Sequence, residues 1–150
     1  MAIQPQDPDF EGRVRSSFAR QPFMETLGAR LLSVAPGEAV LELPFDKRLT
    51  QQIGLLHAGV VAAIADNACG YAALSLMPPG TEVLSVEFKI NLMAPGAGSI
   101  FRAEGRVIRA GRTLTVCSAE VIASDGDQEK VVAVMQATMM SVQGRPGLFD

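Results

Sequence analysis

A run of small and apolar residues at positions 58–77 constrains the fold of this chain more than any other segment. The run reads AGVVAAIADNACGYAALSLM, and the first proline after it is Pro78. Alanine and long aliphatic residues favour a helix, and a helix that is apolar nearly all round is buried on most sides. Because so many of its residues are alanine or glycine, neighbouring backbone can approach it closely. We therefore expect a central helix over 58–77, closely embraced by a sheet.

One carboxylate lies inside this apolar helix. Asp66 is flanked by Ala65 and Asn67, and an acid in such surroundings is costly to bury unless it is paired or has a function. The helix begins directly after His57, which is the only histidine of the chain. Taken alone, Asp66 is as consistent with a structural buried acid as with a catalytic one.

The rest of the chain predicts strands. The runs 29–35 and 38–45, joined by Pro36-Gly37, predict a hairpin in which Leu41, Leu43 and Phe45 face the core. Runs at 83–93, 99–109, 114–124 and 130–142 end at short turn segments and predict an antiparallel meander. Two strands, one buried helix and four strands indicate an α+β domain, with a six-stranded antiparallel sheet wrapped around the helix.

A short helix precedes this domain. Asp7-Pro8 predicts its N-cap and first turn, and the repeat of Phe10, Val14 and Phe18 predicts an amphipathic helix that packs on the domain and ends at Gln21-Pro22. The chain therefore divides into an N-terminal helix segment (1–22), a main domain (23–142) and a polar C-terminal tail (143–150).

Composition excludes several classes of partner. The net charge is −3 and no basic cluster is present, so nucleic acid is not an expected partner. No apolar signal segment is visible in the first 20 residues and the central helix is interrupted by Asp66 and Asn67, so we expect a cytoplasmic protein that does not bind membranes.

The cysteines and the sheet lead to two further expectations. Cys69 and Cys117 lack metal-ligand spacing and predict two buried free thiols, so we expect no metal and no cofactor. One helix cannot cover both faces of a six-stranded sheet, and the mean hydropathy is +0.23. Both observations favour a homo-oligomer.

The order and spacing of His57-Ala58-Gly59, Asp66-Asn67, the small-residue helix and the four following strands resemble the hotdog-fold acyl-CoA thioesterases of the phenylacetate type (PaaI-like). The resemblance covers 23–142, with Pro22-Phe23 and Leu27-Gly28 similar to the family's lead-in. It implies a hotdog fold, hydrolysis of an acyl-CoA to a free acid and coenzyme A, and sites built across a dimer or a dimer of dimers. Coenzyme A is then part of the substrate.

The resemblance also implies roles for individual residues. Asp66 matches the catalytic carboxylate, the Ala58 N–H matches the oxyanion-hole donor, and Gly59 is a second candidate donor. His57 has a supporting role. Gln51, or the adjacent Gln52, matches an amide beside the thioester, and Ser85 matches a residue that orients the attacking water. The family's usual pattern is His-Gly-Gly, and Ala58 departs from it but keeps the backbone N–H.

The chemistry agrees with these roles. The first N–H groups of a helix lack partners and carry the positive end of its dipole, so they can stabilise an oxyanion. A carboxylate can activate water or attack directly, and a thiol of pKa about 8.5 leaves without a strong acid.

Helix geometry limits how these groups can meet. Positions 57 and 66 lie about half a turn apart around a helix and roughly 13 Å apart along it. If His57 and Asp66 both act on one ligand, the site must therefore combine two subunits.

Two other functions stay open from the sequence. A hydratase or dehydratase of acyl thioesters on the same fold would use His57 and Asp66 as an acid/base pair. A non-catalytic module that binds acyl thioesters would need neither.

Overall fold

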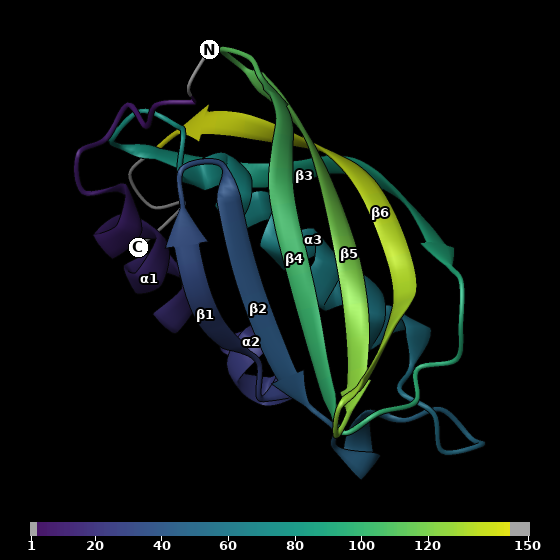
Figure 1. Cartoon of the computed structure of the whole chain (residues 1–150). Helices are drawn as coiled ribbons and strands as arrows, with labels where there is room; N and C mark the ends of the chain where they lie inside the picture. The colour runs from purple at the N-terminus through teal and green to yellow at the C-terminus, as the bar shows by residue number, and fades with distance from the viewer. Residues whose placement is uncertain (1–2, 145–150) are drawn as a thin grey trace.

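A six-stranded antiparallel sheet wraps around one long helix in this protein (Figure 1). The computed structural model describes residues 3–144. The central helix α3 (Ala58–Leu74) lies against all six strands. The predicted α+β architecture, with the sheet around the small-residue helix, is confirmed.

The contact between α3 and the sheet is closest at Gly105 of strand β4 (Ile100–Ala110). A Cβ atom at Gly105 would overlap the backbone carbonyl of Ala68 in α3. Ala68 and its neighbours Ala65 and Cys69 are fully buried there. The small residues therefore let helix and sheet backbones touch, as the composition of the helix predicts.

The helix ends earlier than predicted, at Leu74 rather than residue 77. The Ser75 hydroxyl donates to the Ala72 carbonyl at 2.7 Å and accepts the N–H of Gly37 at 2.8 Å. The next two residues form turn bonds to Ala73 and Leu74 instead of continuing the helix. Ser75 thus joins the end of α3 to the first hairpin.

The sheet order is β1-β2-β4-β5-β6-β3. Besides β4, the strands are β1 (Arg30–Ala35), β2 (Glu38–Pro44), β3 (Thr81–Leu92), β5 (Leu114–Asp125) and β6 (Gln128–Gln143). The hairpin β1-β2 and the meander β4-β5-β6 were predicted correctly.

The predicted pairing of β3 with β4 is wrong, because β3 pairs with β6 at the far edge of the sheet. The segment after β3 packs on the start of α3 instead of forming a turn. The Gly96 carbonyl accepts the Leu56 N–H at 2.9 Å, and the Met93 N–H donates to Val132 at 2.8 Å. These bonds hold the segment between β3 and β4 against the start of α3 and β6, so it cannot form the tight turn of a β3–β4 hairpin.

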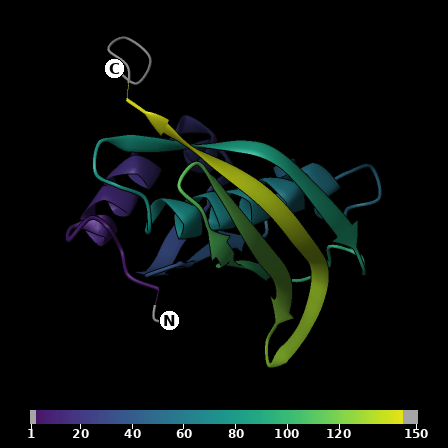
Figure 2. The same cartoon turned by 90° about the horizontal axis from the view of Figure 1, so that it is seen from above.

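Strand β3 forms an edge of the sheet and crosses above α3 (Figure 2). Within residues 3–144 its only strand partner is β6. Four of its large apolar side chains are exposed, namely Leu84, Val86, Phe88 and Leu92. An exposed apolar edge strand is a typical association surface.

The strand alternation predicted the core well, with one exception. Leu41, Leu43, Phe101 and Ala103 are fully buried. Phe45 is 40% exposed, so its predicted burial is wrong. Strand β2 ends at Pro44, and Phe45 lies beyond it with its N–H bonded to the Ser99 carbonyl at 2.9 Å.

Cys69 and Cys117 are buried free thiols, as predicted. No helix in residues 3–144 has the length and apolar character that a membrane span requires.

Two helices precede the sheet. Helix α1 (Phe10–Ala19) confirms the amphipathic segment, and α2 (Pro22–Leu27), which the sequence analysis did not predict, begins with Pro22. The predicted N-cap at Asp7 is wrong. Helix α1 starts three residues later, and the Asp7 carboxylate accepts the Asp9 N–H at 2.9 Å.

The proposed boundaries at residues 22 and 142 stay a prediction. Of the predicted tail, residues 145–150 lie outside the described residues.

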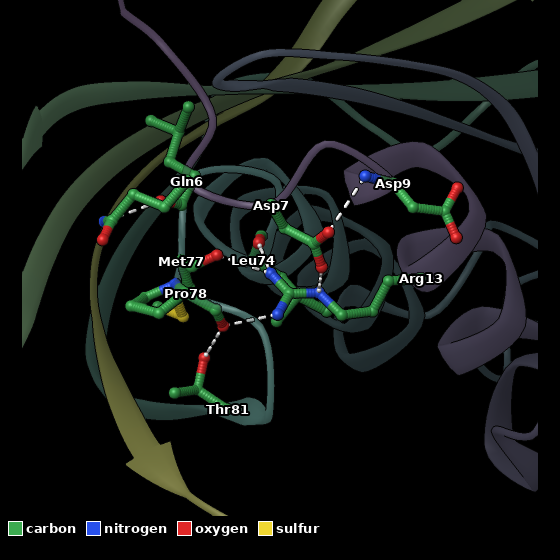
Figure 3. Close-up of polar contacts among 9 residues, drawn as sticks. Gln6, Asp7, Asp9, Arg13, Leu74, Met77, Pro78 and Thr81 are labelled. Atoms are coloured by element: carbon green, nitrogen blue, oxygen red, sulfur yellow. Dashed lines mark hydrogen bonds and ion pairs between the residues drawn. The ribbon is translucent and has the colours of Figure 1, made fainter.

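Arg13 of α1 fastens the N-terminal segment to the end of α3 (Figure 3). Its guanidinium donates to three carbonyls, those of Leu74 at 2.8 Å, Met77 at 2.7 Å and Pro78 at 2.5 Å. Its Nε also lies 3.4 Å from the Asp7 carboxylate, an ion pair without hydrogen-bond geometry. The Leu74 carbonyl ends α3, where a cation is favourable, and the Met77 and Pro78 carbonyls belong to the segment that follows the helix.

We expect Arg13→Ala to lower the free energy of unfolding by about 2 kcal/mol, because it leaves three carbonyls without a charged donor. Arg15→Ala is the matched control, since Arg15 pairs only with Glu11 on the exposed face of α1 and its loss costs about 0.5 kcal/mol or less. Urea unfolding of the wild type and the two variants at equal protein concentration measures both changes in the free energy of unfolding. Equal stability of the two variants would contradict this role of Arg13.

Candidate active site

His57 forms the N-cap of α3. Its backbone is extended (φ −61°, ψ 136°), and its Nδ1 accepts the Gly59 N–H at 2.8 Å. The His57 carbonyl accepts the N–H of Val60 at 2.9 Å and starts the helix. Because Nδ1 accepts a hydrogen bond, the neutral imidazole carries its proton on Nε2. His57 thus shapes the start of the helix.

The two predicted oxyanion donors differ in this structure. The Gly59 N–H is bonded to His57, whereas the Ala58 N–H has no acceptor within residues 3–144. Ala58 is also exposed. The free donor at the positive end of the α3 dipole is therefore the Ala58 N–H.

Gln51 lies beside this donor. Its Oε1 accepts the Ile53 N–H at 2.6 Å, which leaves the side-chain amide N–H groups free to donate. Gln51 and Ala58 line one cavity of about 230 Å³. The remaining lining residues of this cavity are largely apolar, namely Leu55, Leu56, Val61, Leu92, Ala94, Pro95, Gly96 and Val132. We call it the helix-start cavity.

Asp66 lies half-buried on α3 and faces β3. Its Oδ1 accepts the Ser85 hydroxyl at 2.7 Å, so two predicted site residues that lie 19 positions apart meet. Burial raises the pKa of the Asp66 carboxyl above its ordinary value, and the hydrogen bond from Ser85 opposes this rise. A raised carboxyl pKa in an open cavity is typical of a functional acid.

Asp66 opens into a second cavity of about 250 Å³. Its other lining residues come from α1, from Gln21 at the start of α2, from α3 and from β3. They are mostly polar: Ser17, Gln21, Asn67, Gly70, Tyr71, Glu82, Val83 and Ser85. We call it the Asp66 cavity. Sequence reasoning treated α1 as a packing helix and missed Ser17 and Gln21. No local pattern marks them, because only the docking of α1 brings them to Asp66.

The two cavities share no lining residue. Ala58 and Asp66 are roughly 12 Å apart along the axis of α3, since each residue adds 1.5 Å. One protomer therefore presents the free N–H and the carboxylate in separate cavities, as the helix geometry predicts.

Substitution Asp66→Asn should stabilise the protein at pH 7. Burial raises the pKa of Asp66 in the folded state, so the folded protein holds the proton more tightly than the unfolded chain. Stability from this group is present at low pH and is lost as the pH rises through the folded-state pKa. Asparagine does not ionise, so the Asp66→Asn protein does not lose stability in this way as the pH rises.

Thermal unfolding at several pH values and equal protein concentration measures the effect. The advantage of Asp66→Asn should shrink as the pH falls through the raised folded-state pKa of Asp66, and it should be absent below 3.8, the ordinary aspartate pKa. The exposed Asp127→Asn is the control and should change stability by no more than about 0.5 kcal/mol. An Asp66→Asn protein less stable than wild type at pH 7 would refute the expectation.

Comparison with known proteins identifies relatives that share this fold. The thioesterase superfamily model matches residues 53–130, just over half of the chain. A crystal structure of a thioesterase family protein from Silicibacter pomeroyi is 48% identical, with a TM-score of 0.88 over 90% of this chain and 99% of that one.

More distant relatives agree. Escherichia coli PaaI, from the phenylacetic acid degradation operon, shares the fold at 22% identity, with a TM-score of 0.81 over 90% of this chain and 94% of that one. Human acyl-coenzyme A thioesterase 13 is 32% identical over 92 residues, which are 61% of this chain and 65% of that enzyme. The chain belongs to the thioesterase superfamily: it is a thioester hydrolase with the hotdog fold of the PaaI-like proteins, as its sequence predicts.

Proposed function

We propose that this enzyme hydrolyses acyl-CoA thioesters in a site shared by two protomers. Asp66 of one protomer acts as general base or nucleophile, and the Ala58 N–H of the other binds the oxyanion. The observation that carries the proposal is the placement of a half-buried carboxylate and a free helix N–H in separate cavities of one chain. The name of human acyl-coenzyme A thioesterase 13 supports an acyl-CoA substrate.

The exposed edge of β3 supports a shared site. Pairing of this edge with the same edge of a second copy would extend the sheet and cover Leu84, Val86 and Phe88. Such two-fold pairing is self-complementary, and β3 also carries Ser85, the partner of Asp66. In the proposed dimer, the helix-start cavity of one protomer therefore meets the Asp66 cavity of the other.

The reaction follows from these placements. The thioester carbonyl lies at the Ala58 N–H, which stabilises the oxyanion as the tetrahedral intermediate forms. Asp66 either removes a proton from the attacking water or attacks the carbonyl itself, and water then hydrolyses the resulting anhydride. The carbon–sulfur bond breaks, and coenzyme A leaves as a thiolate that takes up a proton. No other cofactor takes part.

Three further residues support this chemistry. Ser85 holds the Asp66 carboxylate by its hydroxyl and orients it towards the water. Gln51 offers its amide N–H beside the thioester. His57 binds the Gly59 N–H, which directs the substrate to the neighbouring Ala58 N–H.

Removal of the carboxylate should abolish turnover. We expect Asp66→Asn and Asp66→Ala to lower kcat for coenzyme A release by about 100- to 10,000-fold, the usual contribution of a general base. A thiol-reactive dye measures release from a panel of acyl-CoA substrates, and Asp127→Asn serves as the control. Turnover that survives in both Asp66 variants would refute the assigned role, and hydration of an enoyl-CoA without thiol release would indicate a hydratase.

A complementation experiment tests the shared site. Proline lacks the N–H and is favoured at the first position of a helix, and the extended backbone of His57 suits a following proline. Ala58→Pro therefore removes the proposed donor with little effect on the fold, and the variant should be inactive.

Mixing the inactive Ala58→Pro and Asp66→Asn proteins under conditions of subunit exchange should restore activity. Random pairing makes half of the dimers mixed, and each mixed dimer has one intact site, so recovery should reach about a quarter of wild-type activity. Absence of recovery, with exchange verified by mass spectrometry, would place both groups in one protomer and overturn the shared site.

A further inference from the structure

Helix α1 forms a fixed wall of the Asp66 cavity. The Gln21 amide donates to the Tyr71 hydroxyl at 2.9 Å, and the Ser17 hydroxyl lies 3.3 Å from the same oxygen. Phe18 packs edge-on against the Tyr71 ring at 5.8 Å. These contacts join α1 to α3, so the cavity that contains Asp66 has a defined polar end.

The charges that line this cavity have one sign. Asp66 and Glu82 are both carboxylates, and no lysine or arginine is among the lining residues. Glu82 is half-buried on β3, and its carboxylate makes no ion pair or hydrogen bond within residues 3–144. The buried Asn67 Oδ1 also lacks a hydrogen-bond partner in this part of the chain. The cavity therefore presents two carboxylates with no cation among its lining residues.

Glu82 lines a neighbouring hollow as well as the Asp66 cavity. A second hollow of about 270 Å³ shares Ser17, Gln21, Tyr71 and Glu82 with the Asp66 cavity and adds Arg20 and Pro22. Arg20 is exposed, and its Nε donates to the Ser16 carbonyl at 3.3 Å. Glu82 therefore lines both hollows, whereas the cation Arg20 lines the neighbouring hollow and not the Asp66 cavity.

We infer that Glu82 is a specificity-determining residue, which makes the enzyme select neutral acyl groups over acyl groups that carry a second carboxylate. The inference rests on the proposed function and adds that the acyl group extends from the reacting carbonyl into the Asp66 cavity. A terminal carboxylate there would face Glu82 and Asp66, and like charges repel strongly where water is partly excluded. A methyl-ended acyl group meets no such repulsion.

The test compares two substrates with acyl groups of about equal size, glutaryl-CoA and 5-methylhexanoyl-CoA. The first acyl group ends in a carboxylate, and the second has two methyl groups in place of the two carboxylate oxygens. We expect wild-type kcat/KM to favour 5-methylhexanoyl-CoA at least about tenfold, and Glu82→Gln to reduce this ratio about tenfold by removing the charge at constant shape. Higher salt should also reduce the wild-type ratio. Glu25→Gln, an exposed change of the same charge on α2, should leave the ratio as in wild type.

Arg20→Gln separates this inference from the opposite one. If Arg20 bound the terminal carboxylate, Arg20→Gln would selectively lower the turnover of glutaryl-CoA, and Glu82→Gln would leave the ratio of the two kcat/KM values unchanged. This result would overturn the inference. Equal wild-type kcat/KM for the two substrates would also overturn it, while the role of Asp66 would stand. Absence of thiol release from 5-methylhexanoyl-CoA and from the whole substrate panel would instead refute the proposed function.

Discussion

The close contact between α3 and β4 is the constraint on which the rest of the structure depends. Gly105 lets the sheet backbone reach the Ala68 carbonyl, and the sheet can then curl around the helix. The sheet contacts α3 near its middle, at Ala68. The first residues of the helix and its face around Asp66 line two separate cavities. A larger side chain at this contact would push the helix away from the sheet and would move both cavities with it.

The proposed role of Asp66 would place a reactive group on the central helix of a stable core. The carboxyl lies on a helix whose neighbouring residues Ala65 and Ala68 are fully buried, and burial raises its pKa. The Ser85 hydroxyl offsets part of this cost and keeps the carboxylate directed at β3. Such a site weakens folding at neutral pH, which is a common feature of groups that are positioned for chemistry rather than for stability.

The N-terminal segment contributes more than packing. Arg13 joins α1 to the carbonyls at and just after the end of α3. Ser17 of α1 and Gln21, which lies between α1 and α2, both contact the Tyr71 hydroxyl. Both sets of contacts fix the wall that faces Asp66 and Glu82. A helix outside the sheet-wrapped core thus forms part of the cavity that contains Asp66.

The sequence by itself determined the elements and the family. Small residues at 58–77 predict the buried helix, and alternating side chains predict the strands, because these patterns depend on neighbours along the chain. The spacing of His57 and Asp66 also predicts that one protomer cannot present both to one ligand. Only the tertiary structure decided that β3 pairs with β6, that Ser85 meets Asp66, and that Ser17 and Gln21 reach the same cavity. These contacts join residues far apart in the chain, and no local pattern specifies which edge a strand takes or where a helix docks.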